Sequence, residues 1–218
     1  MSANTTEGEG AREIPRAMAV AGIIFAILLT CSMILIRLAL PATLGEVIGR
    51  AHRITISRSL IVGINLLPFA GIIFLWFIGV IRDYIGNRED RFFATVLLGS
   101  GLLFIAMLFV SAGIAGGLIS SITTGINRSA NTNLFYTGRA ISYVISTVYA
   151  TRMAGVFMFS TTMLTHRVRL IPRWLADLGF LLAIILLISV SRFEWIILLF
   201  PLWVLIFSFF ILFNRQQR

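Results

Sequence analysis

Long apolar runs separated by short polar connections make up most of this chain. The six runs cover residues 17–36, 60–81, 92–119, 135–165, 175–190 and 195–213. A helix needs about 20 apolar residues to cross a bilayer, and every run comes close to that length or exceeds it. The pattern therefore predicts an all-α, polytopic membrane protein, a six-transmembrane-helix bundle over residues 17–213. Polar tails cover residues 1–16 and 214–218.

Composition supports the same fold class. The mean hydropathy is +0.96, and 58% of the residues are hydrophobic while only 12% are charged. A soluble domain of 218 residues does not hide that much apolar surface in its core. The single cysteine, Cys31, lies inside an apolar run, so the chain has no disulfide of its own.

A charged turn joins the second and third runs. It contains Arg82, Asp83, Arg88, Glu89, Asp90 and Arg91. The acids offset the arginines, and we predict that the turn is a structural latch made of ion pairs. Exposed pairs contribute about 0–1 kcal/mol each, although a network can exceed the sum of its pairs.

The arginines predict an orientation and a partner. All 18 basic residues are arginine, against nine acids, and they are spread over short loops. A spread of this kind argues against nucleic acid and favours a role in topology and contacts with anionic membrane lipids. An even number of spans places both termini on one side. More arginines lie on that side, so we expect both tails and the turns at residues 82–91 and 165–173 to be cytoplasmic.

The sequence offers little for catalysis. Both histidines, His52 and His166, lie in polar connections, and no H-E-x-x-H, C-x-x-C or P-loop pattern occurs. We therefore predict no catalytic residue, no metal and no cofactor. No Asp or Glu lies centrally in a predicted span, which disfavours proton-coupled transport.

One predicted span carries a polar stripe. Ser142, Ser146, Tyr149 and Arg152 recur at a spacing of about 3.6 residues, and Arg152 is the only ionisable residue well inside a span. In one interpretation Arg152 lies close enough to the outer interface for its guanidinium to reach water. In the other, the stripe faces the bundle interior and Arg152, Tyr149, Ser146 and Asn65 bind an anionic headgroup or carboxylate.

Gly113 and Gly117 form a G-x-x-x-G pair in the third run. Such a pair lets a neighbouring helix backbone approach closely. It predicts helix packing, either within the chain or, as the alternative, against a second copy.

The charged turn resembles a loop of major facilitator transporters. The G-x-x-x-D-x-x-G-x-R spacing of that loop is matched by Gly79, Asp83, Gly86 and Arg88. The resemblance implies a cytoplasmic loop that latches one conformation. The chain departs from the family at Tyr84 and Asn87, where the motif is generally basic, and it has only half the usual number of spans.

A second resemblance covers most of the chain. It rests on the segments GIIFLWFIGVIRDYIGNREDRFFATVLLGSGLLFIAMLF, YATRMAGVFMFSTTML, IPRWLADLG and FPLWVLIFSFFILF. Together these segments resemble a family of uncharacterised bacterial multi-pass integral membrane proteins. The resemblance implies a bacterial inner membrane location and transfers no catalytic residue.

Two function classes follow from the sequence. The first is a non-enzymatic membrane component, such as a scaffold, an accessory subunit or a sensor, whose partners are lipids, a second copy or another membrane protein. The alternative is a small carrier, channel or lipid-handling protein with an anion-binding site around Arg152. Polar residues converging on Arg152 would favour the alternative, whereas an Arg152 that faces outward would favour the first class.

Overall fold

The computed structural model describes residues 4–39, 55–85, 91–123, 128–188 and 195–214. Within these ranges the regular elements are all helical, which confirms the all-α class. The elements are α1 (Asn4–Ala39), α3 (Thr55–Ile85), α4 (Arg91–Thr123), α5 (Arg128–Val144), η2 (Ile145–Ala150), α6 (Thr151–Arg167), α7 (Arg173–Ile188), η3 (Ile196–Leu198) and α8 (Leu199–Asn214).

Four helical segments are long and apolar enough to cross a membrane. They are Arg16–Leu38, Arg58–Ile85, Phe92–Leu118 and Ile196–Phe213, and they match four of the six predicted runs. No more than 44% of the apolar window of each segment is buried inside the chain, so much of their apolar surface faces outward. The other two runs fall on the helix that contains Arg152 and on α7, of which 16 residues are described.

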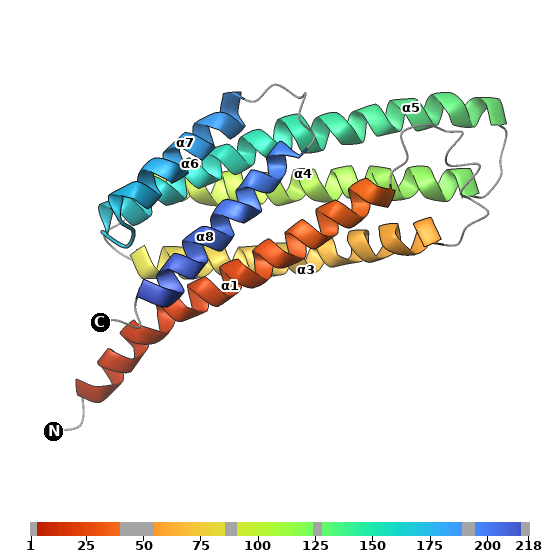
Figure 1. The fold of residues 1–218 in the computed structure, drawn as a ribbon. Coiled ribbons are helices and arrows are strands. Elements are labelled where there is room, and N and C mark those ends of the chain that lie inside the picture. Colours follow the sequence, from red (N-terminus) through yellow and green to blue (C-terminus); the bar gives the residue numbers. More distant parts are fainter. Residues whose placement is uncertain (1–3, 40–54, 86–90, 124–127, 189–194, 215–218) are drawn as a thin grey trace.

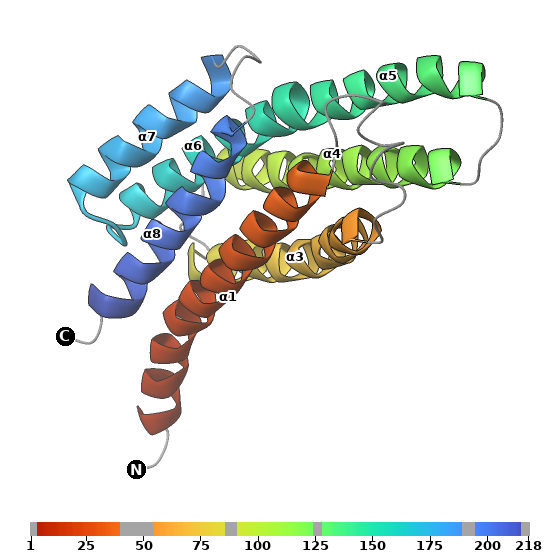
Figure 2. The ribbon, with the colours of Figure 1, turned by 45° about the vertical axis from the view of Figure 1, so that its right-hand side comes forward.

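The helices lie along one long axis. Several helix ends and turns lie together at one end of this axis. Figure 1 shows the start of α1, the end of α8 and the α6–α7 turn at that end, and the view in Figure 2 agrees. α1 packs mainly against α3 and α8, α4 against α3, α5 and α6, and α7 against α6. The predicted polar tail belongs partly to α1, because this helix already begins at Asn4.

Five phenylalanines from five helices form the centre of the core. Phe25 of α1, Phe74 of α3, Phe104 of α4, Phe157 of α6 and Phe200 of α8 are each fully buried. The ring centre of Phe74 lies 4.4 Å from that of Phe25, 4.9 Å from that of Phe157 and 5.8 Å from that of Phe104. Phe200 closes the cluster at 4.8 Å from Phe104. The rings therefore join all five helices at one level.

α5, η2 and α6 form one continuous helix with a π turn at its middle. The π turn spans Ile145–Ala150, and the hydroxyl of Thr151 donates to the carbonyl of Ser146, five residues back, at 3.2 Å. A π turn takes up an extra residue within an α-helix, often at a functional site. One extra residue corresponds to about 100° of rotation around the axis, so the π turn changes which side chains share a face.

The turn between α6 and α7 is tightly closed. Arg169 adopts a left-handed conformation with φ of 56°, and the amide of Leu170 donates to the carbonyl of Thr165 at 2.9 Å. Helices commonly end in this way, usually with glycine in the left-handed position. α7 then begins directly after Pro172.

The charged turn lies largely outside the described residues. Arg82 and Asp83 are exposed near the end of α3. Arg88, Glu89, Asp90 and the side chain of Arg91 lie outside the described part, so the latch of ion pairs stays a prediction.

Candidate functional site

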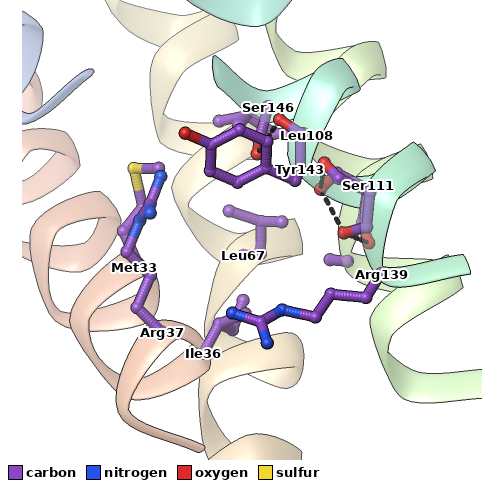
Figure 3. A pocket seen from close by; sticks show the side chains of 11 residues that line it. Met33, Ile36, Arg37, Leu67, Leu108, Ser111, Arg139, Tyr143 and Ser146 are labelled. Carbon is purple, nitrogen blue, oxygen red and sulfur yellow. Dashed lines mark hydrogen bonds between the residues drawn. The ribbon is translucent and has the colours of Figure 1, made fainter. Parts of the chain in front are cut away.

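A pocket opens between α1 and α5, with α3 and α4 as its floor (Figure 3). Its volume is about 110 Å³. The apolar lining consists of Met33, Ile36, Leu67, Leu108 and Ala112. The main neighbours of α1 are α3 and α8, and those of α5 are α4 and η2. The two walls thus face each other across a gap.

Two arginines from opposite walls reach into this gap. Figure 3 shows Arg139 and Tyr143 extending from α5 towards α1, while the side chain of Arg37 rises from α1 beside Met33. The guanidinium carbon of Arg37 also lies 5.9 Å from the ring centre of Trp195, within range of a cation–π interaction. Both arginines belong to the described lining of the pocket.

Serine hydroxyls tie the walls to the floor. The hydroxyl of Ser111 on α4 donates to the carbonyl of Ser142 on α5 at 2.9 Å, and the hydroxyl of Ser142 donates to the carbonyl of Ser111 at 2.9 Å. On the other side, Ser32 of α1 donates to the carbonyl of Gly63 of α3 at 2.7 Å. In hydrocarbon, these hydroxyl groups would find no hydrogen-bond partner outside the protein. The buried hydrogen bonds supply such partners and fix the orientation of both walls.

The residues of the predicted anion site do not lie together in the structure. Ser146 lines the pocket, whereas Arg152 is exposed and Tyr149 is 53% exposed. Asn65 is exposed, and its side-chain amide donates to the carbonyl of Ile61 in its own helix at 2.8 Å. The predicted convergence of polar side chains on Arg152 is therefore not found among the described residues.

The π turn explains why the polar stripe splits. In a regular α-helix, about 100° per residue places Arg152 roughly 80° from Ser142 around the axis. One extra residue in the π turn increases this angle to about 180°. Ser142 and Ser146 precede most of the π turn and face the pocket, whereas Arg152 follows it and faces away.

The sequence does not reveal the arginines of the pocket, for a different reason. Arg37 and Arg139 lie at the ends of the predicted spans, where arginine normally marks the membrane boundary. They are also more than 100 positions apart, and no local spacing connects them. Only the packing of α1 and α5 on the same floor brings them together.

Gly113 and Gly117 do not pack within the described chain. Both are exposed, and a methyl group added to either would meet no described atom within 4 Å. Close packing occurs at other glycines: a Cβ at Gly101 would lie 2.6 Å from Ile78, and one at Gly155 would lie 3.1 Å from the carbonyl of Ala183. Packing of the G-x-x-x-G pair against a second copy stays a prediction.

In the described ranges, no group of three or more His, Cys, Asp and Glu side chains is placed to hold a metal ion. Comparisons of the sequence and fold with family models, curated proteins and solved structures gave no match. The two family resemblances thus stay predictions, and the function is argued from the geometry of the pocket.

Proposed function

We propose that this protein is a non-enzymatic, lipid-handling membrane protein that takes a membrane amphiphile into the pocket between α1 and α5. The observation that carries the proposal is a polar-rimmed pocket with an apolar floor and a gap between two helices as its opening. An amphiphile needs both kinds of surface, an apolar one for its chain and a polar one for its headgroup.

The proposal takes all six runs as spans of a bacterial inner membrane. Support comes from the apolar outer faces of four long segments and from the start of α1 and the end of α8, which lie at the same end of the bundle (Figure 1). Four arginines at one end of the bundle, where α1 begins and α8 ends, are exposed: Arg16, Arg82, Arg167 and Arg173. The arginine rule assigns this end to the cytoplasm, so the pocket would lie in the outer half of the bilayer.

Access to the pocket would be lateral. The gap between α1 and α5 faces the surroundings of the bundle, and these are lipid where the helices cross the membrane. A lipid can therefore enter by moving sideways, with its chain against Leu67 and Leu108. No water-filled path across the membrane is required, which favours lipid handling or sensing over a channel.

The proposal keeps the non-enzymatic class predicted from the sequence and moves the ligand site away from Arg152. The outward position of Arg152 agrees with the interpretation in which its guanidinium reaches the interface. The polar groups that converge from several helices belong to the pocket instead.

Photo-crosslinking tests the proposal. The full chain is reconstituted with phosphatidylglycerol and phosphatidylcholine that carry a diazirine in one acyl chain. We expect labelled peptides from the pocket-lining parts of α1, α3 and α4. Labelling spread evenly over outward positions such as Trp76, with none in the pocket, would contradict lipid uptake. Leu108→Trp, which should fill the floor, is expected to lower pocket labelling, and the exposed Leu102→Trp on the same helix serves as its control.

A further inference from the structure

We infer that a buried water molecule joins α6 to α8 beside Gly179 of α7, where it bridges the hydroxyl of Thr162 and the indole N–H of Trp203. This site lies apart from the pocket between α1 and α5, and the inference does not rest on the proposed lipid handling. It starts from Oγ1 of Thr162 and Nε1 of Trp203. Both side chains are fully buried, and neither atom has a hydrogen-bond partner among the described residues.

Thr162 differs from the neighbouring threonines of α6. The hydroxyl of Thr161 donates to the carbonyl of Phe157 at 2.8 Å, and that of Thr165 donates to the carbonyl of Thr161 at 2.7 Å. A bond to the preceding turn is a common way for a threonine in a helix to satisfy its hydroxyl. Thr162 makes no such bond within the described part of the chain. Its Oγ1 lies towards α7 instead, 2.5 Å from the position that a Cβ would take at Gly179.

The glycine brings the second polar atom to the same place. Nε1 of Trp203 lies 3.0 Å from that Cβ position at Gly179. The distance between Nε1 and Oγ1 of Thr162 therefore cannot exceed the sum of the two lengths. A single water with hydrogen bonds of about 2.8 Å to each atom spans a distance of this size.

The two groups select water by their hydrogen-bonding capacity. An indole N–H donates only, which excludes a cation as its ligand, whereas a threonine hydroxyl both donates and accepts. A water can accept from Trp203 and form its second bond with Thr162. Polar groups buried without a partner cost free energy, and ordered water commonly satisfies such groups in protein interiors.

The turn between α6 and α7 lies on the same side as a third polar group of this kind. His166 is half-buried and lies one helical turn beyond Thr162 on α6. Its Nδ1 is buried, again with no hydrogen-bond partner in the part of the chain that the structure describes. Residues four apart share one face of a helix. This face gives water a polar route from the end of α6 to Thr162.

Hydroxyl-radical footprinting by X-rays tests the inference on the full chain in detergent. The radicals form from water, so a buried side chain is oxidised quickly only where a water touches it. We expect mass spectrometry to find Trp203 oxidised, and Phe200 of the same helix unoxidised, although both are fully buried. Each rate is divided by the rate for the same residue in the unfolded chain, which removes the difference in intrinsic reactivity.

Variants at Thr162 locate the water. Thr162→Val keeps the shape and removes the hydroxyl, so oxidation of Trp203 should fall to the level of Phe200. Thr162→Ser keeps the hydroxyl and should keep the oxidation. Thr161→Val is the matched control, because that hydroxyl is satisfied within its own helix, and it should leave Trp203 unchanged.

Three results would overturn the bridge. If Trp203 in the unchanged protein is oxidised as slowly as Phe200, the site is dry, and the two polar groups bind each other directly or stay unpaired. Oxidation that persists in Thr162→Val would place the water at the indole without Thr162. An equal loss in Thr161→Val would show that the effect is not specific to this hydroxyl. Should Thr162→Val fail to fold, Gly179→Ala decides, because its methyl group occupies the space beside both polar atoms and unchanged oxidation would contradict the site.

Discussion

The aromatic core and the pocket are built on the same three helices, yet one is closed and the other is open. In the core, α1, α3 and α4 present Phe25, Phe74 and Phe104, and rings from α6 and α8 complete the cluster. In the pocket, further along the same helices, the described lining residues include none from α8, and α5 supplies arginine, serine and tyrosine.

Helix length accounts for much of this difference. α8 begins at Leu199, one residue before Phe200 of the ring cluster. Its first residues therefore lie at the level of the core, and no side chain of α8 is among the described lining residues between α1 and α5. The comparison indicates that a helix which begins at the level of the core can leave room for a site between two of its neighbours.

The largest effect should come from breaking the closed region. Phe74→Ala removes the ring that contacts Phe25, Phe104, Phe157 and Phe200, and the cavity should lower stability by about 3–5 kcal/mol. Thermal unfolding in detergent measures the loss. Phe69→Ala on the same helix is the control, because Phe69 is 62% exposed and should change stability by less than about 0.5 kcal/mol. Equal effects would show that the ring cluster is not the centre of the fold.

An intermediate effect is expected at the serine pair behind the pocket. Ser142→Ala removes one hydroxyl and leaves the hydroxyl of Ser111 with the carbonyl of Ser142 as its partner, so a loss of about 0.5–1.5 kcal/mol is expected. A double-mutant cycle with Ser111→Ala, read by thermal unfolding, should give a coupling energy of at least about 0.5 kcal/mol. Ser146→Ala, whose hydroxyl bonds within its own helix, should not couple with Ser111→Ala. Additive effects of the two serines would refute a paired contact.

The smallest effect is expected at Arg152. Its side chain is exposed and lies outside the pocket, and a lysine can also reach the interface with its charge. Arg152→Lys should therefore keep thermal stability within about 0.5 kcal/mol of the unchanged protein and keep the amount of co-purified anionic lipid. A marked loss of that lipid would return the anion site to Arg152 and remove the contrast between the two regions.

The sequence predicted the helical class and most helix positions, because apolar runs of bilayer length leave few alternatives. Residues 60–81 and 92–119, for example, fall within α3 and α4. It did not predict the pocket, which depends on how α1 and α5 face each other. The prediction for Arg152 assumed a regular helix from Ser142 onward, and the π turn at Ile145–Ala150 rotates Arg152 to the outside. No residue type signals a π turn reliably, so the separation of Arg152 from Ser142 and Ser146 could not be predicted from spacing alone.

An experimental structure in nanodiscs that contain phosphatidylglycerol tests the central claim most directly. We predict density for a lipid in the pocket between α1 and α5, with an acyl chain over Leu67 and Leu108. A pocket that is filled by its own side chains, or that holds only water while ordered lipid lies elsewhere on the bundle, would contradict the account.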